Sequence, residues 1–182
     1  MDERIVVDPV LRQRLRFERT TDADGGDVLH VETWVDPGGG VTPHRHPAME
    51  ERFEVLAGEP TFLAGRAWST ASSGETVVVP AGTRHAYRNR GAETVHMVCH
   101  VRPPSSLQEF LEEVAALARD GKISRRGLPT SYGALLEAAA LAQRHRAMVT
   151  LLFPPMPPPF IQRLLFPLLT RLGGRRKEKP NP

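Results

Sequence analysis

The spacing of apolar residues divides the chain near residue 104 into two parts. From about Ile5 to Val101, apolar and polar residues alternate in short runs separated by clusters of Gly, Pro, Asp and Asn, which is typical of an all-β sandwich or barrel. After Pro103 and Pro104 the apolar period changes to about 3.6 residues, which predicts helices. The sequence therefore predicts a mainly β domain over residues 1–104, an α-helical extension over 105–174, and a basic, disordered tail over 175–182.

One run in the β part shows the alternation clearly. Over residues 11–17, Leu11, Leu15 and Phe17 are expected to face the core, whereas the three intervening arginines are expected to face solvent. Base-stacking aromatic residues are not interleaved with these basic side chains. The sequence therefore does not indicate a nucleic-acid partner.

Three helices are expected in the extension. The first should begin at a capping box formed by Ser106 and Glu109 and run to about residue 121. The second should begin at residue 130 or 131 and continue to about residue 153, because the prolines that follow cannot extend a helix. The last has apolar residues spaced over 161–172, with a kink expected at Pro167.

Two groups of residues in the β part have regular spacings. The first group is separated by five, one, four and six residues and consists of Gly38, His44, His46, Glu51 and Gly58. The second is separated by five, one, two and three residues and consists of Gly74, Pro80, Gly82, His85 and Asn89. At these ten positions the chain resembles the cupin family, whose two signatures have this form. The resemblance covers roughly residues 28–102 and implies a double-stranded β-helix, a jelly-roll-like barrel.

The residue types in these groups indicate a metal site on physical grounds as well. His44 and His46 are two residues apart and therefore share one strand face, and Glu51 heads an otherwise apolar face. An unpaired carboxylate buried there would be costly, whereas a cation bound by Glu51 and neutral imidazoles removes that cost. His85 opens the strand that follows a Pro/Gly turn. We therefore expect His44, His46, Glu51 and His85 to bind one divalent metal ion.

Three further residues of the β part have side chains that could take part in a site. Glu50 is an alternative carboxylate, but only Glu51 also leaves six residues before Gly58. Tyr87 should share the face of His85, where it could donate a hydrogen bond or proton to a bound substrate. Cys99 lies in an alternating strand pattern and is given no catalytic role.

Three imidazoles and one carboxylate suit Fe²⁺, Mn²⁺, Ni²⁺, Co²⁺ or Zn²⁺ and leave two positions of an octahedron open. This set permits oxygenase chemistry, and also metal-assisted isomerisation or decarboxylation. The favoured hypothesis is a dioxygenase-like oxidoreductase that acts on a small oxygenated organic molecule. The alternative is a non-catalytic metal or small-molecule binding module. Metal-free sugar isomerisation, which the resemblance also implies, is disfavoured because the full ligand set is present.

Charge is distributed unevenly along the chain. Residues 1–118 carry 12 Lys and Arg against 18 Asp and Glu, whereas residues 119–182 carry 12 against 3. The basic extension could pack on the barrel, pack on a second subunit, cover the barrel mouth, or contact a membrane peripherally through residues 148–179. One cysteine and an N-terminus without a signal-peptide pattern indicate a cytoplasmic location. Strand edges and the family resemblance indicate a homodimer.

Overall fold

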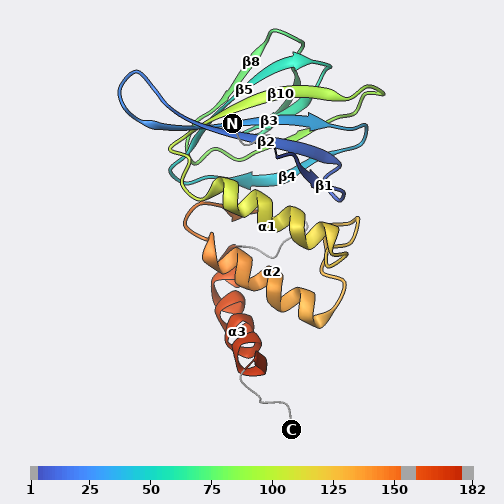
Figure 1. The fold of residues 1–182 in the computed structure, drawn as a ribbon, viewed down its shortest axis with the longest axis vertical. Coiled ribbons are helices and arrows are strands. Elements are labelled where there is room, and N and C mark those ends of the chain that lie inside the picture. The colour runs from blue at the N-terminus through green and yellow to red at the C-terminus, as the bar shows by residue number, and fades with distance from the viewer. Residues whose placement is uncertain (1–3, 153–158, 178–182) are drawn as a thin grey trace.

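The computed structural model describes residues 4–152 and 159–177, and it has two antiparallel β-sheets followed by a layer of helices (Figure 1). The first sheet has the strand order β1-β2-β3-β10-β5-β8, and the second has the order β11-β4-β9-β6-β7. Neighbouring strands of one sheet are often far apart in the sequence, as expected for a jelly-roll-like barrel. The mainly β fold with a helical extension is therefore confirmed.

The strands are short and follow the predicted turns. Those of the first sheet are β1 (Val6–Asp8), β2 (Gln13–Thr21), β3 (Asp27–Val35), β10 (Val95–Arg102), β5 (Glu50–Ala57) and β8 (Thr76–Val79). Those of the second are β11 (Thr150–Leu151), β4 (Gly40–Arg45), β9 (His85–Arg88), β6 (Thr61–Ala64) and β7 (Ala67–Thr70).

The core lies between the two sheets and continues under the first helix. Its most deeply buried side chains include Leu29, Val55, Met97 and Val101 from the first sheet and Phe62 from the second. Alternation holds in β5, where the inward residues are buried and the intervening ones are exposed. This alternation is what places Glu51 at the inner end of an apolar strand face.

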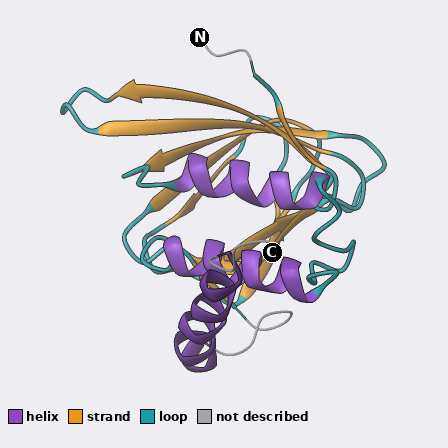
Figure 2. Cartoon of the chain, turned by 60° about the horizontal axis from the view of Figure 1, so that its bottom comes forward, coloured by secondary structure: helices purple, strands orange, loops and turns teal. Residues whose placement is uncertain are grey.

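Three helices follow the barrel: α1 (Leu107–Arg119), α2 (Tyr132–Arg144) and α3 (Pro159–Lys177). Helix α1 lies against the barrel, α2 lies beyond α1, and α3 projects at the far end of the molecule (Figures 1 and 2). Leu107 and Phe110 of α1 join the barrel core. A second apolar cluster joins α2 to α3 and contains Leu136, Ala139, Phe166 and Leu169.

The expected capping box at the start of α1 is wrong. The Ser106 hydroxyl makes no capping hydrogen bond, and its Oγ instead lies 2.8 Å from Nδ1 of His145. Ser106 therefore joins α1 to the segment after α2. The predicted start of α2 is confirmed, because the Ser131 side chain accepts a hydrogen bond from the Ala134 amide.

The predicted extent of α2 is also wrong. The helix ends at Arg144, a turn follows in which the amides of Met148 and Val149 donate to the His145 carbonyl, and β11 then pairs with β4. The open edge of β4 offers this segment backbone hydrogen bonds that compete with helix continuation. The predicted helix end at Phe153 lies outside the described residues.

Helix α3 begins two residues before the predicted apolar run and continues through Pro167 to Lys177. It therefore includes the first three residues of the expected tail, and residues 178–182 lie outside the described part. Among the described residues, no helix is both long and apolar enough to cross a bilayer.

Candidate metal centre

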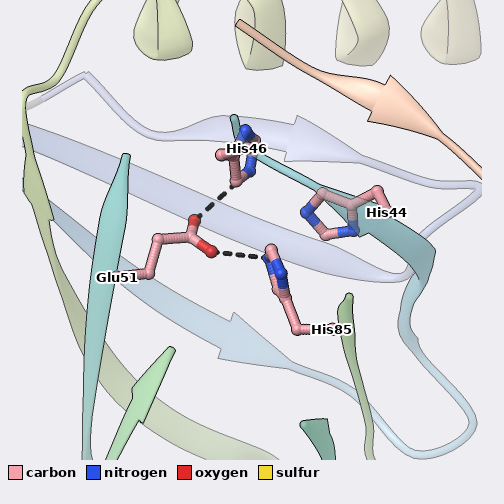
Figure 3. A group of neighbouring side chains, drawn as sticks. All are labelled: His44, His46, Glu51 and His85. Atoms are coloured by element: carbon pink, nitrogen blue, oxygen red, sulfur yellow. Dashed lines mark ion pairs between the residues drawn. The ribbon is translucent and has the colours of Figure 1, made fainter. Parts of the chain in front are cut away.

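The four predicted ligands come from three strands and one adjoining loop, and they meet inside the barrel (Figure 3). His44 lies on β4 and His46 follows that strand, while Glu51 lies near the start of β5 and His85 opens β9. A turn at Gly82, with φ of +77°, leads into β9, and its amide donates to the His46 carbonyl over 2.7 Å. The turn therefore holds the segments of His46 and His85 together.

The donor atoms are close enough for one ion. One nitrogen from each histidine and one Glu51 oxygen all lie within 4.8 Å of one another. Nε2 of His85 is 2.6 Å from Oε2 of Glu51, and Nε2 of His46 is 3.6 Å from Oε1. The ring centroids of His44 and His85 are 4.1 Å apart.

Backbone carbonyls orient all three imidazoles. Nδ1 of His44 lies 2.9 Å from the Thr42 carbonyl, Nδ1 of His85 lies 2.9 Å from the Thr83 carbonyl, and Nδ1 of His46 lies 3.0 Å from the Met148 carbonyl. A carbonyl can only accept, so each Nδ1 carries the proton and donates it. Each neutral ring then has an unprotonated Nε2, the state that binds a metal.

Three atoms of the cluster lack a partner within the described part of the chain. His46, Glu51 and His85 are only 2%, 6% and 3% exposed, and no hydrogen-bond partner there satisfies Nε2 of His46, Oε2 of Glu51 or Nε2 of His85. With Nδ1–H of His85 donated to Thr83, its contact with Glu51 joins two acceptor atoms unless a cation lies there. A proton or a metal ion can meet that need, and the residues therefore fit a divalent metal.

The electrostatics keep this site ready for a cation. Burial, reinforced by the neighbouring histidines, lowers the pKa of His44 to about 3, and burial also lowers the pKa of His46. Burial opposes ionisation of Glu51, but its contacts with the imidazoles bring its pKa down to about 2. Burial likewise opposes protonation of His85, yet the Glu51 carboxylate raises the pKa of His85. Without a metal ion, the cluster is thus one carboxylate facing neutral imidazoles at His44 and His46, with a proton favoured on His85 that a metal ion would replace.

The structure separates the two candidate carboxylates. Glu51 points into the cluster, whereas Glu50 is exposed. Tyr87 is buried, and its hydroxyl donates to Oε1 of Gln13 over 2.7 Å. Burial raises the pKa of Tyr87 above its usual range, and its role toward a substrate stays a prediction.

Two groups that contact the site were not predicted from the sequence. The Met148 carbonyl orients His46 from 102 positions away, and Gln13 occupies the Tyr87 hydroxyl. A backbone carbonyl has no residue signature, so the Met148 contact left no local signal. Cys99 is buried, and burial raises the pKa of its thiol well above normal, in keeping with the absence of a catalytic assignment.

Comparison with known families identifies the barrel. Residues 31–101 match the cupin domain model, and this segment spans β3 to β10 and holds all four ligand residues. Residues 31–101 are therefore a cupin domain. No curated protein matches this cupin chain.

Solved structures similar to this cupin are distant in sequence. TT1209 from Thermus thermophilus is 20% identical, with 48% of this chain and 84% of that chain covered and a TM-score of 0.42. An uncharacterized conserved protein with a double-stranded β-helix domain from Klebsiella pneumoniae is 22% identical, with 50% and 74% covered and a TM-score of 0.43. KdgF from Halomonas sp. is 19% identical, with 56% and 88% covered and a TM-score of 0.47.

Proposed function

We propose that this cupin binds one divalent transition metal ion and is a dioxygenase-like oxidoreductase acting on a small oxygenated organic molecule. The observation that carries the proposal is the convergence of three carbonyl-oriented imidazoles on one buried carboxylate, with three atoms left without a partner among the described residues. Such a set of nitrogen and oxygen donors suits Fe²⁺, Mn²⁺, Ni²⁺, Co²⁺ or Zn²⁺.

The chain's own residues would prepare the site for that chemistry. Glu51 supplies the negative charge, and the lowered pKa values of His44 and His46 keep both rings neutral, with Nε2 unprotonated, at neutral pH. Phe53 is buried on the same strand face as Glu51 and favours an organic ligand with apolar parts. Once bound, a redox-active ion would supply activation of O₂ and of a chelating substrate at its two remaining positions. In a dioxygenase both oxygen atoms enter the product, so no external reductant is consumed.

Access to the centre would be from the side of His44. This is the one ligand side chain of the four that is half-buried, whereas the other three are buried. This partial exposure supports a catalytic reading over a fully sealed structural ion.

A non-catalytic metal or small-molecule binding module is the second candidate, and one observation favours it. The Tyr87 hydroxyl, the acid group expected to serve a substrate, is already bonded to Gln13 and is buried. Metal-assisted isomerisation or decarboxylation would use the same ligands without O₂. The homodimer and the cytoplasmic location expected from the sequence stay predictions.

Anaerobic loading with Fe²⁺ followed by nitric oxide tests the proposal, because nitric oxide binds ferrous iron at an open position and gives an electron paramagnetic resonance signal. We expect about one iron per chain, a nitric oxide adduct, and O₂ uptake with some member of a panel of small hydroxy and keto acids. Stoichiometric iron without an adduct would support the binding module. A protein that acquires neither iron nor another divalent metal would overturn the metal centre itself.

A further inference from the structure

Helix α3 has large apolar side chains on two opposite faces. Its inner face packs Phe166 and Leu169 against α2. Its outer face exposes 66% of Phe160, 72% of Leu164 and 55% of Leu168, which are spaced by four residues, and 39% of Ile161 and 38% of Leu165 beside them. Five exposed apolar residues on one helix face form a patch of the kind that marks an interaction site. We call these five residues the outer face of α3.

The outer face is well placed to reach a large partner. Helix α3 projects from the end of the molecule opposite the barrel, beyond α1 and α2 (Figures 1 and 2). It is held by its contacts with α2 and by Gln162, whose Nε2 donates to the Leu151 carbonyl over 2.9 Å. The outer face can therefore contact a partner while the inner face of α3 stays packed on α2.

The charge around this face selects among possible partners. Helix α3 has no acidic residue and five basic ones: Arg163, Arg171, Arg175, Arg176 and Lys177. A two-fold contact with a second copy would bring this positive charge against itself. A negatively charged bilayer surface complements both the charge and the apolar side chains.

We propose that the outer face of α3 docks the protein on the surface of an anionic phospholipid bilayer, with the helix lying in the plane of the interface. Phe160 and Leu164 would enter the boundary between headgroups and acyl chains, while Arg163 and Arg171 would remain at the headgroups.

Co-sedimentation with vesicles of phosphatidylcholine alone and of phosphatidylcholine mixed with the anionic lipid phosphatidylglycerol tests this docking. We expect binding to the anionic vesicles that weakens with salt. The double substitution Leu164→Gln with Leu168→Gln should weaken binding by more than about tenfold. Arg163→Gln should weaken it by about fivefold, since one basic residue near the surface is worth about 1 kcal/mol.

Leu56→Gln with Val78→Gln is the matched control, because both residues are exposed and apolar and belong to β5 and β8, which lie at the opposite end of the molecule from α3 (Figure 1). The control should bind vesicles like the wild type. Failure of the wild type to bind anionic vesicles, or equal binding by the α3 double variant, would overturn the proposal. Conversion of a dimer to a monomer by the α3 variant, measured by light scattering, would assign the face to a second copy instead.

A second inference rests on different contacts, those of residues 148–152, which we call the strap. The Met148 carbonyl accepts from His46, Leu151 pairs with His44 in the β4–β11 ladder, and the Leu152 amide donates to the Pro43 carbonyl over 3.1 Å. The strap therefore touches two proposed ligands, and Gln162 of α3 bonds to it at Leu151.

We infer that the strap is a positioning element of the metal centre, so that docking of the helical extension and metal affinity are linked. The inference rests on the proposed metal site. Because such coupling is reciprocal, an ion held at the site should stabilise the strap, and a detached strap should weaken metal binding. Loss of an outer contact of a metal ligand typically reduces affinity by about 10- to 100-fold.

Leu152→Pro removes one amide donor of the strap, and Leu152→Ala is the control that keeps it. We expect Leu152→Pro to weaken Zn²⁺ binding at least about tenfold in a chelator competition and Leu152→Ala to leave it near wild type. Hydrogen exchange on the wild type gives a second readout, with slower exchange at Leu152 when Zn²⁺ is bound.

The possible outcomes distinguish loss of the metal centre from loss of its coupling to the strap. A wild type that binds no metal would remove the metal centre. A wild type that binds metal, with Leu152→Pro binding equally and no change in strap exchange, would leave the metal centre standing and overturn the coupling alone.

Discussion

The candidate metal centre places four polar side chains inside the barrel, whereas α3 exposes five large apolar side chains to solvent. Folding ordinarily buries apolar groups and pairs any polar group that it buries. The cluster of the four candidate ligands leaves buried polar atoms without a partner among the described residues, and α3 leaves apolar side chains exposed. A cation is the partner that we propose for the unpaired nitrogen and oxygen atoms, and an anionic bilayer is the partner that we propose for the apolar face of α3.

The two regions also differ in how tightly the fold constrains them. Backbone carbonyls orient each imidazole of the centre, and a 2.7 Å hydrogen bond joins the Gly82 turn to His46. The outer face of α3 needs only the helix itself and its packing on α2. Changes at the centre should therefore have larger consequences than changes on the outer face.

The largest effect should come from His44→Ala combined with His85→Ala. This variant should bind no stoichiometric metal, because two of four ligands are gone. The measurement is elemental analysis together with the metal-induced increase in melting temperature. At 100 times its dissociation constant, metal stabilises a protein by about 2.7 kcal/mol, and that increment should vanish in the variant. Comparing each protein with and without metal removes any direct effect of the substitutions on the fold.

The next effect should separate two adjacent carboxylates. Glu51→Gln should weaken metal binding by more than about a hundredfold, because it neutralises a ligand, which costs more than losing an outer contact. Glu50→Gln is its matched control, since Glu50 is exposed and outside the cluster. Isothermal titration with Zn²⁺ makes the comparison. Equal affinities for the two variants would contradict the assignment of Glu51.

A smaller effect concerns acid stability without metal. The pKa of His44 is lowered to about 3 in the folded protein, so between pH 6.5 and 3 the unfolded chain binds a proton at this position that the folded chain does not. His44 therefore costs no stability above pH 6.5 and destabilises the fold progressively below it, by at most about 1.4 kcal/mol per pH unit. Urea unfolding across this range should show a shallower loss in His44→Gln. An equal loss in both proteins would contradict the low pKa.

The smallest effect should appear on the outer face of α3. Leu164→Gln with Leu168→Gln should change the free energy of unfolding by no more than about 0.5 kcal/mol and should leave metal affinity unchanged, since both side chains are exposed. Leu169→Gln, on the inner face, should cost about 2 kcal/mol through lost packing on α2. Thermal unfolding compares them. A large cost from the outer substitutions would mean that these side chains already have a partner within the protein.

Much of the barrel and its centre could be predicted because the determining features are local. Strict alternation in β5 shows which side of the strand Glu51 occupies, and the motif spacing distinguishes it from Glu50. The helix start at Ser131 was predictable for the same reason, since a capping side chain bonds to an amide three residues away.

What could not be predicted depends on contacts between distant segments. Ser106 has the residue type of a helix cap, but it bonds to His145 instead. Residues after Arg144 have helical composition, yet Thr150 and Leu151 form β11 because they pair with the open edge of β4. Tyr87 lies on the core face expected of it, but its hydroxyl donates a hydrogen bond to Gln13, which is 74 positions away in the sequence.

The sequence by itself determined the cupin barrel and the identity of the four candidate ligands, because strand alternation and turn residues act over a few positions. Only the tertiary structure decided that the helical extension completes the centre through the Met148 carbonyl and leaves one face of α3 uncovered by the described residues. Both features depend on where the helical extension packs against parts of the chain that are distant in the sequence. The free energy of that placement comes from burial and backbone pairing summed over the whole fold, and no local pattern records it.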